Sequence, residues 1–206
     1  MSLRVYIYRD EPAYANYKTA VERAGGIPCF GAAPESCDAL LLPGGGDMEP
    51  WRYGQENIAS RNLEPERDAI ELELLENFTS RRRPVLGICR GMQAINVFFG
   101  GDLVQDWPGH SAVDGADRLH TVTTAHSFLG ELYGEECLVN SCHHQIIGRL
   151  GEGLEALQWA SDGVVEAFQH KKLPVWGLQW HPERLLDSDS AADGLLVYRA
   201  FLDQLH

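Results

Sequence analysis

The residue best suited to covalent chemistry is Cys89, in the segment GICRG at residues 87–91. A short apolar run at residues 84–88 leads into it and is typical of a buried strand. A helical pattern follows and stops at Gly100-Gly101. A strand, a tight turn between two glycines and a helix form a nucleophile elbow, the thiol counterpart of G-x-S-x-G. The helix N-terminus favours a thiolate over a thiol, and the N–H of Arg90 can then face an oxyanion.

The alternative is that Cys89 is a small core residue, as most unpaired cysteines are. Two glycines at the elbow spacing, between a strand-like run and a helix-like run, favour the nucleophile instead. The predicted chemistry is therefore acyl transfer through a thiol.

A thiol nucleophile needs a base, and the base needs a group that orients it. The segment Trp180-His181-Pro182-Glu183 supplies both. Side chains two residues apart in an extended chain lie on the same side, and Pro182 biases His181 away from helical geometry. Glu183 can then fix the tautomer of His181 while the other ring nitrogen faces Cys89. With eight histidines a His-x-Glu pair arises easily by chance, so its place after a strand, downstream of the elbow, carries the prediction.

A glycine loop can bring backbone N–H groups to the same site. The apolar run at residues 38–42 stops at Pro43-Gly44-Gly45-Gly46-Asp47. In a parallel α/β sheet, ligands bind beside the ends of such strands, and glycines let the backbone approach closely. A plain turn is the alternative for three glycines taken alone.

The elements that must position these residues differ between the two halves of the chain. Strand-like and helix-like segments alternate in the first half, and the second half holds mainly strand-like segments before a final helix. This order predicts an α/β fold with a mostly parallel central sheet, flanking helices and a small antiparallel extension. Residues 154–161 and 164–169 read as a hairpin around Asp162-Gly163. The other expected strands cover residues 4–8, 27–30, 38–42, 84–88, 103–106, 119–123, 137–141 and 175–180, and the expected helices cover residues 13–24, 64–80, the segment after Cys89, and 191–205.

The composition limits the classes of protein to which this chain can belong. The 206 residues fit one domain, residues 1–206, and the net charge of −13 argues against nucleic-acid and anionic-membrane partners. The odd number of cysteines, with no C-x-x-C pair, suits free thiols in a reducing compartment, so a cytoplasmic protein is expected. No metal or cofactor is predicted, since the adjacent His143 and His144 would face opposite ways on a strand. We expect His120 and His126 to serve structure.

Four segments together resemble the class I glutamine amidotransferase superfamily: GICRGMQ, LPGGGD, VNSCHHQ and LQWHPE. The resemblance is more specific to its hydrolytic branch of γ-glutamyl peptidases (peptidase C26-like), which includes the γ-glutamyl-γ-aminobutyrate hydrolases. PERDAIELELLE before the elbow, NVFFGGDLVQD after it and SDGVVEAF before the last strand also resemble that branch. The resemblance covers residues 40–183 and implies the flavodoxin-like fold of the superfamily.

The resemblance also implies roles for individual residues. Cys89 would be the nucleophile, His181 the general base and acid, and Glu183 the residue that orients His181. The oxyanion donors would be the N–H of Arg90 and an N–H of the glycine loop, at Gly44 or Gly45. The substrate-binding residues would be Gln93, near the glutamyl group, and Asn140, Ser141, Cys142 and His143, in the loop that holds its α-amino and α-carboxylate ends.

Three functions follow as hypotheses. The first is a free-standing hydrolase that cleaves a γ-glutamyl amide, such as glutamine or γ-glutamyl-γ-aminobutyrate, through a γ-glutamyl thioester and releases glutamate. The second is a glutaminase subunit that delivers ammonia to a separate synthetase partner. The third is a binding or regulatory module without catalysis. The loops around Trp51 and Trp107 are expected to select the leaving amine.

Overall fold

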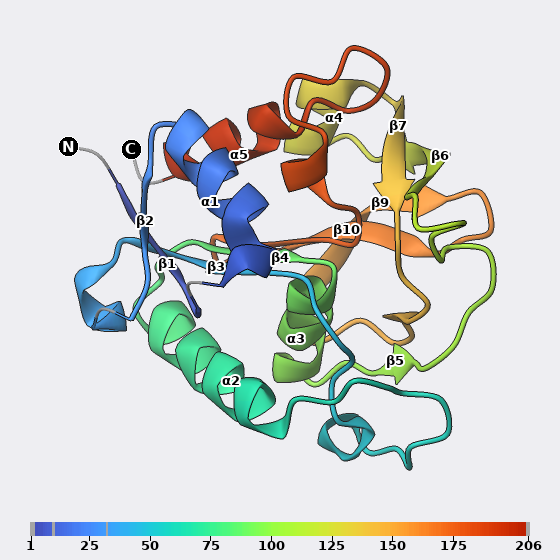
Figure 1. The fold of residues 1–206 in the computed structure, drawn as a ribbon, viewed down its shortest axis with the longest axis horizontal. Helices are drawn as coiled ribbons and strands as arrows, with labels where there is room; N and C mark the ends of the chain where they lie inside the picture. The colour runs from blue at the N-terminus through green and yellow to red at the C-terminus, as the bar shows by residue number, and fades with distance from the viewer. Residues whose placement is uncertain (1–2, 10, 32, 205–206) are drawn as a thin grey trace.

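The computed structural model describes residues 3–9, 11–31 and 33–204. Five strands form the parallel half of the central sheet, in the order β2-β1-β3-β4-β11 (Figure 1). They are short and mostly buried, as expected for apolar runs covered on both faces. Their bounds are β1 (Arg4–Ile7), β2 (Ile27–Cys29), β3 (Ala39–Leu42), β4 (Val85–Ile88) and β11 (Val175–Leu178).

Four antiparallel strands continue the same sheet beyond β11, in the order β10-β9-β6-β7. The expected hairpin is present, because β9 (Leu154–Ala160) pairs with β10 (Val165–His170). A separate two-stranded sheet pairs β5 (Leu103–Val104) with β8 (Ile146–Ile147). The remaining strands are β6 (Arg118–Thr124) and β7 (Glu136–Ser141).

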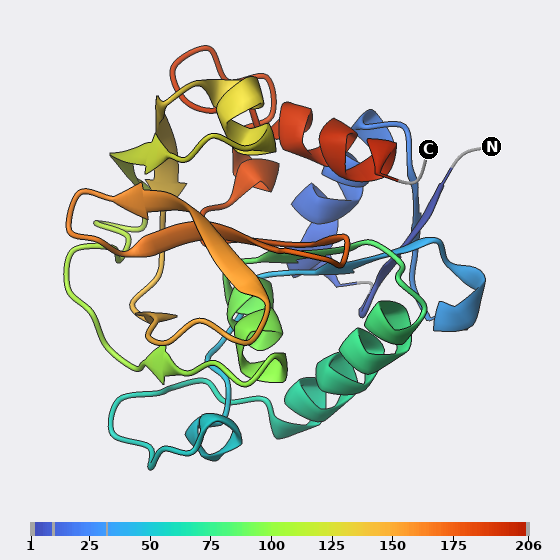
Figure 2. The same ribbon diagram turned by 180° about the vertical axis from the view of Figure 1, so that it is seen from behind.

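Helices cover both faces of the sheet, so the molecule has three layers (Figure 2). On one face, α1 (Ala15–Arg23), α4 (Phe128–Tyr133) and α5 (Gly194–Asp203) supply Val21, Leu129 and Phe201 to one core cluster. On the other face, α2 (Pro65–Ser80) and α3 (Arg90–Phe98) supply Leu75 and Ile95 to a second cluster. The predicted fold class, a mostly parallel sheet between helices with an antiparallel extension, is confirmed.

The differences from the sequence-based elements are local. Helix α4 and strand β8 were not predicted, because six residues containing Gly130 and two residues at Ile146-Ile147 are too short to show a period. The terminal helix begins at Gly194, three residues later than expected, where the Asp193 side chain accepts a hydrogen bond from the Leu195 N–H. Residue 205, at the expected end of that helix, lies outside the described residues.

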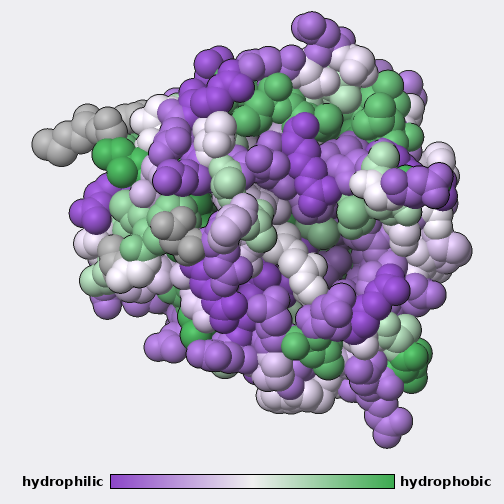
Figure 3. Space-filling view, viewed as in Figure 1, coloured by the Kyte–Doolittle hydropathy of each residue, from purple (hydrophilic) through white to green (hydrophobic). Residues whose placement is uncertain are grey.

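The surface agrees with the composition. The face seen in Figure 3 is largely hydrophilic, with apolar side chains in scattered patches, as a net charge of −13 suggests. Within the described part of the chain, we find no helix with the length and apolar character needed to cross a membrane.

Candidate active site

Three neighbouring parallel strands bring the predicted residues to one edge of the sheet. Leu42 of β3 is in register with Gly87 of β4, and Leu178 of β11 is in register with Ile88 of β4. Because the strands end together, the residues that follow them meet at the carboxyl edge. These residues are Gly44 after β3, Cys89 after β4 and His181 after β11.

Cys89 lies in a strained turn between β4 and α3. Its φ of 52° and ψ of −105° fall in a region that residues with side chains seldom occupy. The flanking glycines allow this turn: a Cβ on Gly91 would lie 2.1 Å from the Leu42 carbonyl oxygen, and one on Gly87 would lie 2.5 Å from the Gly91 backbone. The crowding expected of a nucleophile elbow is therefore present, and Cys89 is 7% exposed.

His181 and Glu183 are directly paired. The His181 Nδ1 lies 2.7 Å from the Glu183 Oε1, and both side chains are buried. Burial opposes the charged form of the ring, but the charges of Cys89 and Glu183 and hydrogen bonds to both raise the pKa of His181 from 6.5 to about 10. The structure thus brings together Cys89, His181 and Glu183, and these neighbours favour the charged form of the imidazole.

Asn140 holds the backbone of His181. The His181 N–H donates to the Asn140 Oδ1 at 2.9 Å, and the Asn140 Nδ2 donates to the His181 carbonyl at 3.2 Å. The same Nδ2 also donates to Asp117 at 2.9 Å. The predicted substrate residue Asn140 therefore directs its amide to the backbone of His181 and to Asp117.

Tyr17 of α1 was not predicted and lies inside the site. Its hydroxyl accepts a hydrogen bond from the Gly44 N–H at 2.9 Å and lies 3.4 Å from the His181 Nδ1. Burial raises the pKa of Tyr17 well above its ordinary value of 10.0, so the phenol is neutral. In the described part of the chain, the N–H groups of Gly45 and Arg90 have no hydrogen-bond acceptor. These two N–H groups, and not the N–H of Gly44, are available to an oxyanion.

Arg67 of α2 supports the glycine loop and was also not predicted. Its Nη2 donates to the carbonyls of Pro43 at 2.8 Å and Gly44 at 3.0 Å. A Cβ on Gly45 would lie 2.1 Å from the Arg67 Nη1, so only glycine fits beside the guanidinium. The segment PERDAIE, noted for its family resemblance, contains this residue; its place beside the loop depends on helix packing that the sequence does not reveal.

A cavity of about 350 Å³ opens beside His181. Its walls come from the start of α1, the glycine loop, the start of α2 and the segment after β11, and they carry charges of both signs. Its lining residues are Glu11, Ala13, Tyr14, Asn16, Tyr17, Gly44, Gly45, Glu64, Arg67, His181, Glu183 and Arg184.

The other predicted substrate residues do not line the cavity beside His181. Gln93 is buried, and its Nε2 donates at 3.3 Å to the Gln145 carbonyl and to the Gln179 Oε1. The Ser141 hydroxyl donates to the His110 carbonyl at 2.8 Å, and His143 is buried near Glu166. Cys142 is half-buried. The side chains of Ser141 and His143 thus have partners away from the cavity.

The tryptophan loops do not form the cavity wall. Trp51 is 64% exposed and lies under the Arg52 guanidinium, and Trp107 donates from its Nε1 to Asp162 at 3.0 Å. The expectation that these loops select the leaving amine therefore stays a prediction, and the cavity beside His181 is lined instead by charged residues at the starts of α1 and α2.

Known proteins with similar sequences include glutamine amidotransferase-like proteins and a γ-glutamyl hydrolase. A candidate glutamine amidotransferase of Mycobacterium tuberculosis, Rv2859c, is 38% identical over 92% of this chain, which spans 66% of that relative's length. The γ-glutamyl-γ-aminobutyrate hydrolase of Escherichia coli O157:H7 is 29% identical over 90% of this chain and 83% of its own length.

A solved structure shares the fold. It is a candidate GMP synthase component from Thermoplasma acidophilum, which superposes with a TM-score of 0.71 over 100% of this chain and 94% of its own, at 19% identity. The sequence model of the Peptidase C26 family matches residues 4–183, which is most of the chain. The chain therefore belongs to the Peptidase C26 family, whose relatives include glutamine amidotransferase-like proteins and γ-glutamyl hydrolases.

Proposed function

We propose that the protein is a cysteine hydrolase that cleaves the γ-glutamyl amide bond of a small compound and releases glutamate. The observation that carries the proposal is the strained Cys89 at the start of α3, beside a charged His181 whose Nδ1 is 2.7 Å from Glu183. A thiol, a base and an orienting carboxylate are the parts that nucleophilic acyl transfer requires.

The chemistry would proceed in two halves. The Cys89 sulfur attacks the γ-carbonyl carbon, and the N–H groups of Gly45 and Arg90 stabilise the resulting oxyanion. His181 gives its proton to the departing amine as the C–N bond breaks, which leaves a γ-glutamyl thioester on Cys89. His181 then removes a proton from water, the hydroxide adds to the thioester, and the C–S bond breaks to release glutamate. The steps use no cofactor.

The two ends of the substrate would meet different parts of the site. Gln93 and the backbone of residues 140–145 lie on the buried side, where a glutamyl group is expected from the family resemblance. The leaving amine would lie in the cavity, beside Glu64, Arg67 and Arg184. Charges of both signs favour a leaving group that is polar or itself charged.

The test is glutamate release from a panel of γ-glutamyl amides that includes glutamine and γ-glutamyl-γ-aminobutyrate. Cys89→Ala should lower kcat/KM by roughly 1,000-fold or more on any accepted substrate, because the acyl acceptor is gone. Cys137→Ala is the matched control, since this half-buried thiol on β7 lies away from the site. Equal activity of the wild type and Cys89→Ala would show that Cys89 is not the nucleophile.

A glutaminase subunit is the second candidate, favoured by the shared fold with a candidate GMP synthase component. In that case ammonia would pass to a separate synthetase. Glutamine hydrolysis should then rise when an extract of the source cells is added. Full activity of the isolated chain on amides other than glutamine would exclude this role. We place either activity in a reducing compartment such as the cytoplasm, because the five cysteines are free thiols.

A further inference from the structure

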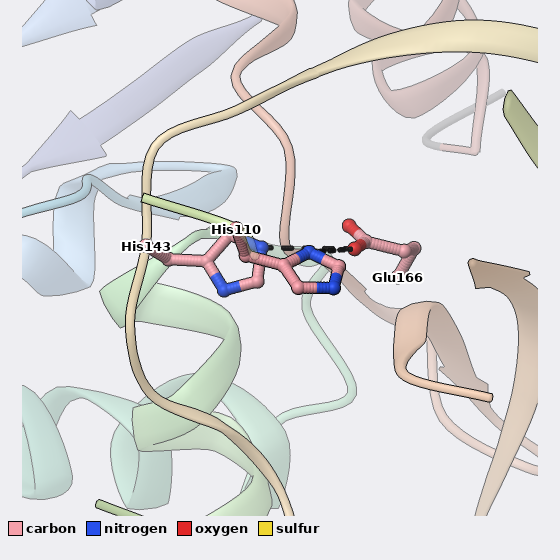
Figure 4. Close-up of side chains that lie close together, drawn as sticks. All are labelled: His110, His143 and Glu166. Carbon is pink, nitrogen blue, oxygen red and sulfur yellow. Dashed lines mark ion pairs between the residues drawn. The ribbon is translucent and has the colours of Figure 1, made fainter. Parts of the chain in front are cut away.

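A second cluster of titratable side chains lies around Glu166 of β10, outside the cavity beside His181. Glu166 is 0% exposed, and three histidines surround one of its oxygens. The Glu166 Oε1 lies 3.3 Å from the His110 Nδ1, 3.3 Å from the His120 Nε2 and 3.6 Å from the His143 Nε2. His110, His143 and Glu166 come from segments far apart in the sequence, and their side chains point toward one another (Figure 4).

The outer nitrogens of two of these rings have partners that fix the position of the proton. The His143 Nδ1 lies 3.0 Å from the Gln145 carbonyl, which only accepts, so this nitrogen carries the hydrogen. The His110 Nε2 lies 3.1 Å from the Asp162 Oδ2, again an acceptor. In the neutral rings, the His110 Nδ1 and the His143 Nε2 therefore present lone pairs to Glu166.

With the rings neutral, these lone pairs face a buried carboxylate, and the nearest remaining donor is the His120 Nε2, 3.3 Å from the Glu166 Oε1. Both oxygens of Glu166 and the His143 Nε2 are buried without a hydrogen bond of normal geometry in the described part of the chain. The Ser141 hydroxyl, near the His110 Nδ1, donates its proton to the His110 carbonyl instead. Buried anionic oxygen facing lone pairs is strongly unfavourable, so positive charge is required among these atoms. Two sources fit: a second proton on an imidazole, which agrees with the raised pKa of His110 beside Glu166, or a bound metal ion.

The spacing of the atoms also fits a metal ion. N–H···O bonds span about 2.7–3.2 Å, so the 3.3 Å contact with His110 is a long hydrogen bond and the 3.6 Å contact with His143 lies beyond that range. A zinc ion with ligand bonds of about 2.0–2.1 Å holds neighbouring tetrahedral ligands roughly 3.3–3.4 Å apart. One atom each from His110, His143 and Glu166 lies within 4.8 Å of the other two. The outer partners Asp162 and Gln145 match the groups that orient metal-bound imidazoles.

We propose that the His110 Nδ1, the His143 Nε2 and the Glu166 Oε1 bind a divalent transition-metal ion of the zinc class. His120, beside the same carboxylate oxygen, borders the site. The ion would tie the loop before β6 and the segment after β7 to β10, and so hold residues 140–145 behind the catalytic groups. A metal here departs from the sequence-based expectation of none, because the ligands have no close spacing in the chain. Its binding does not depend on the proposed hydrolysis.

The test uses the full chain without an affinity tag, stripped with a chelator and titrated with Co²⁺. Co²⁺ accepts the same nitrogen and oxygen ligands as Zn²⁺, and its visible absorption reports their number. The Cys89→Ala background removes the reactive thiol from competition for the metal. We expect one Co²⁺ per chain with the bands of a four- or five-coordinate ion, and a higher Tm after Zn²⁺ addition.

Variants identify the ligands. Glu166→Gln should abolish the Co²⁺ bands, and the exposed His126→Gln is the matched control that should keep them. If Glu166→Gln does not fold, Asp162→Asn tests the site instead. This substitution leaves the ligands in place and replaces only the carboxylate that pairs with the His110 Nε2. It should weaken Co²⁺ binding by about 10- to 100-fold. Binding below one equivalent in the Cys89→Ala chain, or equal binding by the Asp162→Asn chain, would overturn the proposal in favour of protonated imidazoles around Glu166.

Discussion

At the scale of single residues, the charge on His181 organises the site. Its backbone is held on both sides by Asn140, its Nδ1 by Glu183, and Tyr17 lies close to the same nitrogen. These contacts leave the ring little freedom, and Cys89 is close enough to help raise its pKa. A cationic imidazole next to a thiol favours the thiolate, and in the proposed reaction it would supply the proton that the leaving amine needs.

We predict that Glu183→Gln lowers the pKa of His181 from about 10 toward 6.5, because it removes the carboxylate paired with the Nδ1. The pKa in the fold is raised above the ordinary value, so the stabilisation by the charged ring is full below pH 6.5 and is lost as the pH rises through about 10. NMR titration of the His181 ring carbons measures the pKa directly.

Glu131→Gln is the control for that titration, since this carboxylate is exposed on α4 and should leave the pKa of His181 unchanged. The alkaline limit of kcat/KM should move down with the pKa in Glu183→Gln. An unchanged His181 pKa in Glu183→Gln would contradict the assignment of Glu183 as the orienting carboxylate.

At the scale of elements, α2 fixes the two parts that carry the proposed oxyanion donors. Glu71 accepts from the Arg67 Nε at 2.8 Å and also pairs with Arg90, and Arg90 pairs with Asp68. Arg67 holds the glycine loop, and Arg90 is the first residue of α3. The buried network therefore couples the loop after β3 to the helix behind Cys89. Burial raises the pKa of Asp68, and its charged partners and the Glu49 N–H oppose this rise.

We predict that Glu71→Gln destabilises the fold by about 3–5 kcal/mol, because it leaves two buried guanidinium groups without one of their shared anions. Urea unfolding measures the change. Glu73→Gln, on the exposed side of the same helix, should change stability by less than about 0.5 kcal/mol. Equal effects of the two substitutions would show that the network contributes no stability. If the N–H groups of Gly45 and Arg90 bind the oxyanion as proposed, folded Glu71→Gln protein should also show a larger fall in kcat than rise in KM, since both groups depend on the network.

The elements and the local motif could be predicted from the sequence because their signals are contiguous. The run at residues 84–88, the glycines around Cys89 and the pair His181-Pro182-Glu183 each lie within a few residues. Tyr17 and Arg67 could not be predicted, because they reach the site by the packing of α1 and α2 against the sheet. The same holds for Glu166 and His110, whose proximity follows from strand pairing between distant segments.

At the scale of the whole molecule, the two halves of the sheet position different groups of residues. The parallel strands place the glycine loop, Cys89 and His181 at one edge, as their apolar runs and following turns indicated. The antiparallel strands carry the segment after β7 and the cluster around Glu166. The sequence predicted this extension but not its role. Alternation of side chains shows that a strand exists, but it does not show which residues lie opposite the polar face of that strand.

The two core clusters, rather than covalent links, hold these halves together, and this gives a prediction for the entire fold. All five cysteines are free thiols, so a reductant should leave the Tm unchanged.

Burial and the charge of Cys29 raise the pKa of Cys37 to about 11, and burial raises that of Cys137 to about 11. Iodoacetamide at neutral pH should therefore modify Cys89 well before Cys37 or Cys137, because Cys89 has an imidazolium beside it. Peptide mass spectrometry measures the order, with the urea-unfolded chain, in which all five should react, as the control. A lower Tm after reduction, or a cysteine that stays unreactive in urea, would contradict a fold held by its two cores alone.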